Sequence, residues 1–437
     1  MKNKTFVICI ALWVIITLLR LFTHQPWADE AWAWILTKEF HFGNILETIH
    51  TEGHFFVWYL MLLPFAKLNI AYPYSMLIIN WLCCLGAIFV LWKYSNFNNL
   101  LKVIICFSFP FLSYYPIVAR CYSIGILLLF LLSALYKDKL KHPVIYSVLI
   151  FFCANTSVMA LIGAFFFGLI FAYELFKEKN TKALQICSYI GAFTVLTLLI
   201  QIIGVSKSTL NSEMLRGLDI HSLLTPFIFS EWINAILLIV FGTVFFKSMY
   251  KNKKSLFFLA GTFLFLLYIF NFWYLGDFWH YYFFYFYLII ACWIFLSDEN
   301  VETKSKKNIL ICLTVISAFL IFDYRYEPRV FNSGSKIVAG YVKEHKNDRQ
   351  VFINSVYSMV LPYIDYKNYD LTIKKKIENK DITFDFIENL INKDKDNYLY
   401  MNNCNELKDL SKNGKVITFK KEKSILKTYC IYKIDLK

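Results

Sequence analysis

The chain has 437 residues, of which 58% are hydrophobic and 17% are charged. Soluble domains average roughly 45–50% apolar residues, so this composition favours an integral membrane protein. The formal net charge of +14 does not indicate a nucleic-acid-binding protein. Before residue 323 the basic residues fall in short clusters between apolar segments, whereas a phosphodiester backbone requires a continuous basic face.

Apolar segments long enough to cross a bilayer follow one another up to about residue 322. Roughly 30 Å of hydrocarbon requires about 20 apolar residues. The N-terminal segment resembles a signal peptide but lacks a small-residue cleavage site, so we expect a retained first helix. Residues 1–322 are predicted to form an all-α bundle of about eleven transmembrane helices. The expected spans are 5–23, 72–92, 100–117, 119–136, 143–156, 158–176, 183–204, 231–249, 255–273, 279–296 and 308–322.

The basic residues between these spans predict the orientation of the chain. With the N-terminus in the cytoplasm, alternation places 17 basic residues on the cytoplasmic side and 6 on the opposite side, in agreement with the positive-inside rule. Residues 55–70 are apolar but short, and counting them as a span would reverse this bias. We therefore expect them at the membrane interface, and we expect a protein of a bacterial-type plasma membrane whose C-terminal region is extracytoplasmic.

The last quarter of the chain, residues 323–437, has the composition of a water-soluble domain. Its alternating helical and strand periodicities predict a small α/β domain. The helices are expected at 336–345 and 384–392, and the strands at 350–356, 398–401, 415–419 and 428–434.

The eleven cysteines fall into two groups. Nine of them lie in or beside apolar segments, where cysteine usually packs as a small apolar residue. Cys404 and Cys430 lie in the C-terminal domain and would be able to pair in an oxidising compartment. No metal-ligand spacing occurs among the cysteines.

A pair of acidic residues, Asp29 and Glu30, follows the first span. The pair lies in the external loop 24–71, within Pro26-Trp-Ala-Asp-Glu-Ala-Trp-Ala-Trp34, and the tryptophans favour headgroup depth. A carboxylate partly shielded from water is able to act as the general base for a hydroxyl nucleophile. The alternative is an ordinary helix start, with Asp as N-cap and Glu in the first turn.

A second candidate is Arg120, which lies two residues before Tyr122 at the external end of a predicted helical hairpin. A guanidinium beside a tyrosine hydroxyl suits a phosphate, to which arginine donates two parallel hydrogen bonds. The alternative is an arginine that extends to lipid headgroups.

Further candidates are predicted on the same side of the membrane. Glu52 and His54 precede the interfacial segment, Asn155 ends the fifth span, and His280 lies at the start of the tenth. The histidines lack the spacing of a metal site, and single histidines in such turns more often serve as interfacial hydrogen-bonding groups. With Arg120 and the acid pair, these side chains are expected to form one site supplied from the bilayer.

The order of these motifs resembles the GT-C superfamily of membrane glycosyltransferases, which includes protein O-mannosyltransferases and lipid A aminoarabinose transferases. The similarity covers about residues 1–300. Glu52-Gly-His-Phe-Phe-Val is similar to the family's Gly-His-Pro-Pro-Leu-type segment, with phenylalanines in place of the prolines. Ala119-Arg-Cys-Tyr-Ser123 is similar to its Ala-Arg-Pro/Asn-Tyr-Ala-like sequence, and His280-Tyr281 loosely matches an Arg-Tyr pair before a late helix.

The resemblance implies an inverting enzyme that transfers a sugar from a polyprenyl-phosphate donor to an extracytoplasmic glycan, lipid or protein acceptor. Asp29 would be the base, Glu30 would orient the acceptor, and Arg120 would stabilise the departing phosphate. The remaining substrate-binding residues would be Glu52, His54, Tyr122, Asn155 and His280. A Mg²⁺ or Mn²⁺ ion at Asp29 and Glu30 is left open, because hard cations need several oxygen ligands.

Two other functions fit parts of the sequence. A transporter or a lipid or glycolipid flippase also has many helices, but such proteins commonly have inverted repeats and broken helices with charges at mid-membrane, and neither is expected from this sequence. A non-catalytic scaffold would need neither the acid pair nor Arg120.

Overall fold

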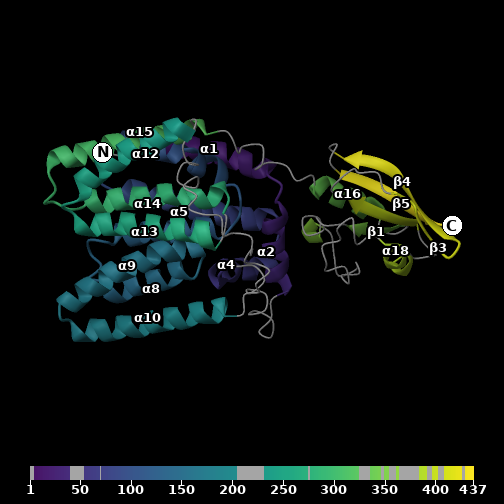
Figure 1. Ribbon diagram of the computed structural model, residues 1–437, viewed down its shortest axis with the longest axis horizontal. Coiled ribbons are helices and arrows are strands. Elements are labelled where there is room, and N and C mark those ends of the chain that lie inside the picture. The colour runs from purple at the N-terminus through teal and green to yellow at the C-terminus, as the bar shows by residue number, and fades with distance from the viewer. Residues whose placement is uncertain are drawn as a thin grey trace. The chain divides into compact units, whose positions relative to one another are not determined.

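The chain is mostly helical, with a small sheet near its C-terminus (Figure 1). The computed structural model describes residues 4–39, 54–68, 70–203, 231–273, 276–323, 335–345, 349–353, 361–363, 383–390, 396–401, 408–425 and 429–437. The chain forms two compact units. Unit 1 comprises Met1–Thr23, Phe40–Pro64 and Met76–Val330, and unit 2 comprises His24–Glu39, Phe65–Ser75 and Phe331–Lys437.

Most of unit 1 is a helical bundle. Among the described residues, seven segments are long and apolar enough to cross a membrane. They are α1 (Lys4–Thr23), α5 (Tyr74–Tyr94), α9 (Val158–Lys177), α10 (Thr181–Ile202), α13 (Lys253–Phe272), α14 (Phe278–Leu296), and α15 (Thr303–Phe319) with its 3₁₀ extension η2 (Leu320–Phe322). This number is compatible with an integral membrane protein and is smaller than the eleven spans expected.

Four other helices overlap the remaining expected spans: α6 (Asn99–Phe107), α7 (Tyr122–Ala134), α8 (Pro143–Ala154) and α12 (Glu231–Met249). A further short apolar helix is α4 (Phe56–Lys67). At 1.5 Å per residue, the 12 residues of α4 reach about 18 Å, well short of a bilayer core. This length fits the interfacial position expected for residues 55–70.

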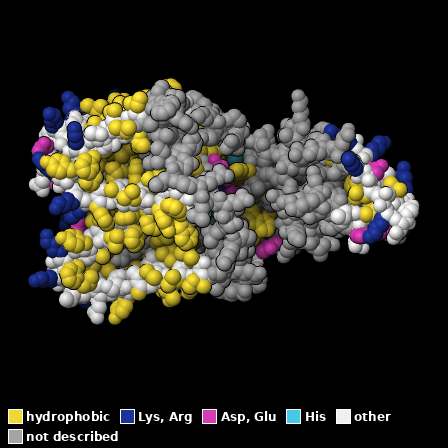
Figure 2. Space-filling view, in the orientation of Figure 1, with side chains coloured by type: hydrophobic (Ala, Val, Ile, Leu, Met, Phe, Trp, Pro, Cys, Tyr) yellow, Lys and Arg dark blue, Asp and Glu magenta, His cyan; other side chains and the backbone are white. Residues whose placement is uncertain are grey.

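Charged side chains of separate loops meet at one end of unit 1. Figure 2 shows Lys and Arg gathered there, at the left of the view, with hydrophobic side chains along the flank. The Nζ of Lys139 lies 2.9 Å from one carboxylate oxygen of Glu174, and the Nζ of Lys254 lies 2.6 Å from the other. Lys139 is 4% exposed and Glu174 is 9% exposed. The two lysines therefore join the α7–α8 connection and the start of α13 to the end of α9.

Replacing Glu174 with glutamine should lower the melting temperature of the detergent-solubilised protein. Removing one partner leaves the buried Lys139 charge uncompensated, which costs about 3 kcal/mol of unfolding free energy. The matched control is Glu299→Gln, because Glu299 is 90% exposed and pairs with Lys137 across 3.3 Å. The control should melt like the unmodified protein, and equal melting of all three proteins would contradict the assigned role of Glu174.

The segment between α6 and α7 departs from the expected continuous span 100–117. Helix α6 ends at Phe107, Ser108 is extended (φ −65°, ψ 150°), and a π-helical turn η1 (Pro110–Tyr114) follows. Pro110 has no backbone N–H to donate, which favours a break in the helix. The segment expected as one continuous span is therefore interrupted between Phe107 and Pro110.

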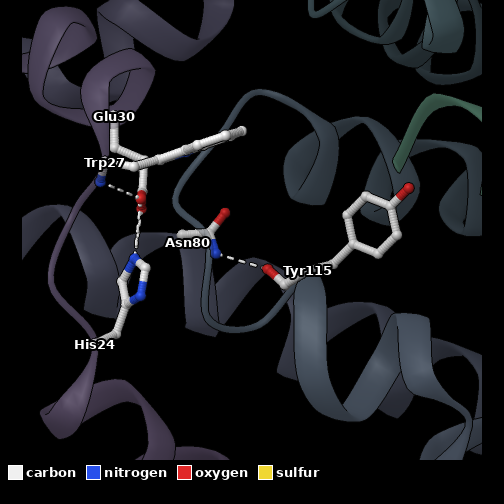
Figure 3. Close-up of polar contacts among 5 residues, drawn as sticks. All are labelled: His24, Trp27, Glu30, Asn80 and Tyr115. Atoms are coloured by element: carbon white, nitrogen blue, oxygen red, sulfur yellow. Dashed lines mark hydrogen bonds and ion pairs between the residues drawn. The ribbon is translucent and has the colours of Figure 1, made fainter. Parts of the chain in front are cut away.

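Side chains of distant helices satisfy the carbonyl groups exposed by this break. The indole Nε1 of Trp13 donates to the Phe111 carbonyl at 2.8 Å. The Asn80 amide donates to the Tyr115 carbonyl at 2.7 Å (Figure 3). Irregular backbone at membrane depth is tolerated where protein groups satisfy it or where it lines a cavity. Hydrogen bonds from other helices of the bundle therefore stabilise the interrupted helix.

Unit 2 contains a five-stranded sheet with strand order β1-β2-β5-β4-β3. The strands are β1 (Arg349–Ile353), β2 (Asp396–Met401), β3 (Leu410–Lys412), β4 (Lys415–Ile425) and β5 (Tyr429–Leu436). Strands β1 and β2 are parallel and the other pairs are antiparallel. Each of the four strands expected from the sequence overlaps one of these, and β3 is additional.

Helices and a tight turn complete the described part of unit 2. The helices are α2 (Ala28–Glu39), α16 (Ser335–His345), α18 (Phe384–Leu390) and the 3₁₀ turn η4 (Leu361–Tyr363). Asn413 and Gly414, both with positive φ (52° and 79°), connect β3 to β4, as Asn-Gly does in two-residue hairpins. Cys430 is disulfide-bonded, and Cys404 lies outside the described residues.

Candidate functional site

The candidate residues fall into separate parts of the structure. Asp29 and Glu30 belong to unit 2, whereas the candidates from His54 onward belong to unit 1. Glu52 lies outside the described residues, so its predicted role stays untested.

In unit 1, the structure brings together four side chains that are far apart in the sequence. Arg120, in the turn before α7, is 7% exposed and donates from Nη2 to Nε2 of His54. Tyr122 is the first residue of α7, and its hydroxyl lies 2.7 Å from Nε2 of His280 on α14. The His54 and Tyr122 rings meet edge to face, with centroids 6.0 Å apart. These residues, His54, Arg120, Tyr122 and His280, are called the Arg120 cluster.

The contacts of His54 determine its protonation state. A guanidinium only donates, so Nε2 of His54 must be an acceptor and the proton of the neutral ring must be on Nδ1. That nitrogen lies 3.6 Å from the sulfur of Cys121. Burial, followed by the positive charge of Arg120, lowers the pKa of His54 well below its usual range. His54 is therefore neutral and accepts a hydrogen bond from Arg120 without neutralising the positive charge of the guanidinium.

His280 has the opposite tautomer. Its Nδ1 accepts the backbone N–H of Asp277 at 2.9 Å, as part of the capping box of α14. The proton of the neutral ring is therefore on Nε2, which donates to the Tyr122 hydroxyl. The indole nitrogen of Trp279 also lies 3.2 Å from Nε2, but a protonated Nε2 has no lone pair for it. Since the Tyr122 oxygen accepts from His280, its own hydrogen is directed elsewhere.

These groups have the properties of an anion site. Arg120 and Tyr122 flank the N-terminus of α7, where Cys121 makes no side-chain capping bond. A helix N-terminus presents backbone N–H groups and a partial positive charge, and it favours phosphate and carboxylate groups. A guanidinium and an oriented phenol add strong, directional donors.

Acidification should destabilise the protein through His54. Because the folded state keeps this ring neutral, the unfolded state binds one more proton below the ordinary histidine pKa of about 6.5. Stability is therefore lost as the pH falls below that value, by up to about 1.4 kcal/mol per pH unit from this residue. His54→Gln keeps an acceptor for Arg120 and should show a smaller drop in melting temperature between pH 7.5 and 5. The exposed His142, changed to Gln, is the control, and equal drops for both variants would contradict this role.

Asn155 lies in a separate hydrogen-bonded network of unit 1. Its side-chain oxygen accepts from Nε2 of Gln201 at 2.7 Å, and Oε1 of Gln201 accepts the backbone N–H of Phe56 at 2.9 Å. The Asn155 carbonyl also accepts the N–H of Val57 at 3.2 Å. The network ties the ends of α8 and α10 to the first turn of α4, directly after His54. Gln201 was missed from the sequence, although a glutamine inside an apolar segment was the available signal.

In unit 2, Glu30 rather than Asp29 is the buried member of the acid pair. Glu30 is 0% exposed, and its carboxylate lies 2.9 Å and 3.2 Å from Nε2 of His24 (Figure 3). It also accepts the backbone N–H of Trp27 at 3.1 Å. Trp27 precedes α2 and accepts the first helical bond from Ala31. Glu30 therefore caps the helix. His24, Trp27 and Glu30 are called the Glu30 cluster.

Asp29 is the second residue of α2 and is exposed. It does not occupy the N-cap position considered from the sequence, and it is accessible from solvent. His24 was missed from the sequence, because six residues separate it from Glu30 across a non-helical turn. Among the described residues, no group of three or more His, Cys, Asp or Glu side chains is arranged to hold a metal ion.

The structure thus contains two clusters of polar side chains in segments that the sequence predicts to lie outside the cytoplasm. The Arg120 cluster is suited to bind an anion. The Glu30 cluster fixes a short helix that presents an exposed carboxylate. No family model, no curated protein and no solved structure matches this chain.

Proposed function

We propose that the chain is an inverting membrane glycosyltransferase of the GT-C type. It takes a sugar from a polyprenyl-phosphate donor and transfers it to a glycan, lipid or protein acceptor of the cell envelope. The observation that carries the proposal is the Arg120 cluster, a buried guanidinium and an oriented phenol at a helix N-terminus of an apolar bundle. A phosphate with a lipid tail combines the anion and the apolar chain that this environment suits.

The proposed reaction is a direct displacement at the anomeric carbon. The acceptor oxygen forms a bond to this carbon as the bond to the phosphate oxygen breaks, and the electron pair leaves with the lipid phosphate. Positive charge develops on the sugar ring and negative charge on the leaving group. Arg120 and Tyr122 stabilise this negative charge through hydrogen bonds that strengthen as it develops.

The acceptor's proton passes to Asp29 in this scheme. An exposed carboxylate at the start of a helix is accessible to an acceptor from outside the membrane, and it is able to take the proton as the new bond forms. Glu30, fixed by His24, holds the first turn of α2 and orients the acceptor through that helix. The Glu30 carboxylate is buried against His24 and caps α2, whereas Asp29 is exposed, so the two carboxylates as placed do not fit a shared Mg²⁺ or Mn²⁺ site.

Contacts within each unit support an eleven-span topology with an external C-terminal domain. Among the described residues of unit 1, the ion pairs between separate loops join loops assigned to the cytoplasm, as Lys137–Glu299 and Lys251–Glu302 do. The Arg120 cluster joins only segments assigned to the outside. The four further spans are α6 with η1, α7, α8 and α12. The disulfide of Cys430 is typical of an oxidising, extracytoplasmic compartment.

A reporter fused after Lys437 should be active outside the cytoplasm, and one fused at Lys139 should be active inside. The distribution of basic residues places Lys139 in the cytoplasm with the N-terminus, and an odd number of spans places Lys437 on the other side of the membrane. Paired alkaline phosphatase and fluorescent-protein fusions at both positions measure this directly. Activity of both fusions on one side would contradict the topology, and with it the assignment of the Arg120 cluster to the outside.

A flippase is the second candidate, because the interrupted segment between α6 and α7 is a feature that transporters share. The two functions differ in where an unused donor accumulates. Cells that lack the protein should accumulate a polyprenyl-phosphate sugar in the outer leaflet, where an added glycosidase reaches it. Accumulation confined to the inner leaflet would favour the flippase, and an unchanged lipid profile would contradict both.

A further inference from the structure

Helix α2, which carries Glu30, also contacts the C-terminal part of unit 2. The turn η4 touches both α2 and α16. The ring of Tyr363 in η4 lies edge to face on Tyr72, with centroids 4.9 Å apart and an interplanar angle of 75°. The Tyr72 ring in turn lies 5.3 Å from Trp34 of α2. A line of three aromatic rings therefore joins the C-terminal domain to α2.

Trp34, the ring of α2 that contacts Tyr72, lies one helical turn after the acidic residues at the start of the helix. Trp34 follows Glu30 by four residues, so both lie on one face of the helix, and both are almost fully buried. Burial raises the pKa of Tyr72 well above its usual range, and Tyr363 and Glu30 add to this effect. Tyr72 therefore stays neutral and its hydroxyl lies within electrostatic range of Glu30.

Helix α2 needs such contacts to keep its orientation. It has 12 residues, and isolated helices of this length are marginal in water. The Glu30 cluster holds its first turn, and Trp34 is the anchor in the next. Edge-to-face pairs such as Tyr72 and Tyr363 stabilise specific ring orientations as well as burying apolar surface.

We propose that Tyr363 is a positioning residue through which the C-terminal domain holds α2 and, with it, Asp29 and Glu30. The domain then contributes to the reaction by fixing the carboxylate helix. Only the consequence for catalysis rests on the proposed glycosyltransferase function, because the structural coupling is measurable without any substrate.

Hydrogen–deuterium exchange of the full-length protein in lipid nanodiscs tests the coupling. Tyr363→Ala should speed amide exchange in α2 by about 2- to 10-fold, the factor expected for the loss of one aromatic pair. Exchange in α13 should not change. Tyr363→Phe keeps the ring and should exchange like the unmodified protein. Ile337→Ala removes an exposed side chain of α16 and serves as the control.

Tyr72→Ala removes the ring that lies between Tyr363 and Trp34. It leaves the sequence of η4 unchanged, so a local misfolding of η4 cannot explain an effect of this variant on α2. Both alanine variants should affect α2, with unchanged exchange in the β4–β5 hairpin. Unchanged exchange of α2 in both variants, or exchange that rises only in the tail strands, would overturn the proposal. In a transfer assay, Tyr363→Ala should lower kcat while leaving KM for the lipid donor unchanged, because the Arg120 cluster is intact. Faster α2 exchange without any transferase activity of the unmodified protein would support the coupling and refute the proposed function.

Discussion

Replacing Asp29 with asparagine should lower the rate of sugar transfer by about 10²- to 10⁴-fold, the usual contribution of a general base. An amide has nearly the shape of the carboxylate but cannot accept the acceptor's proton at neutral pH. Asp29 is exposed in the first turn of α2, and the capping bonds of that turn are made by Glu30. Folding should therefore be little affected, and the loss should fall on kcat.

The measurement is single-turnover transfer by purified protein with its lipid donor, accompanied by a melting curve. Glu39→Gln is the matched control, because Glu39 is an acidic residue at the other end of the same helix. It should keep the full rate. Normal transfer by Asp29→Asn would remove Asp29 from the mechanism and make Glu30 the next candidate for the base. The Glu30→Gln protein should in any case be less stable, because Glu30 is buried against His24.

Replacing Arg120 with lysine should lower kcat by about 10²-fold although the positive charge is kept. The planar guanidinium donates two parallel bonds to a phosphate, whereas an ammonium presents a single point charge. Losing one well-placed donor to a developing anion typically costs about 10²- to 10³-fold.

Arg20→Lys is the matched control, since Arg20 lies in the last turn of α1 and donates to the Ser113 hydroxyl. A lysine is also able to donate to the Ser113 hydroxyl, so transfer should stay within about twofold. Equal activity of Arg120→Lys and the unmodified protein would contradict the proposed role of Arg120 in stabilising the leaving phosphate. A donor-binding assay with the polyprenyl-phosphate sugar separates loss of affinity from loss of rate.

The local features of the sequence were sufficient to predict the classes of element. Apolar length and spacing predict helices, because the bilayer requires satisfied backbone groups over a fixed thickness. Alternating periodicity predicts the strands at 415–419 and 428–434, which become β4 and β5. These signals depend on neighbouring residues alone, so they can be identified without knowledge of the fold.

The break between α6 and α7 was decided by tertiary contacts. The apolar pattern of residues 100–117 is that of a continuous span, and the prolines at 110 and 116 are the local signals against a regular helix. The irregular backbone is tolerated because Trp13 and Asn80, from two other helices, bond to its carbonyl groups. Sequence reading cannot find such donors, because they are 98 and 35 residues away from their acceptors.

The pairing of site residues depended on the tertiary structure in the same way. The sequence places His54, Arg120, Tyr122 and His280 at one membrane surface, because all lie at helix ends assigned to the same side. It does not say that Arg120 bonds to His54, or that the backbone of Asp277 fixes the tautomer of His280. Those relations follow from the packing of α7 against α14.

The two carboxylates of the acid pair, Asp29 and Glu30, have different environments in the structure. The sequence determined that two carboxylates follow the first span, beside tryptophans that favour the membrane surface. It does not show which of the two carboxylates is buried, because burial depends on the residues of other segments that pack against the helix. Adjacent residues of a helix lie about 100° apart around its axis, and the packing of α2 decides which of the two sides is covered. One carboxylate is buried against His24 and the other is open to solvent.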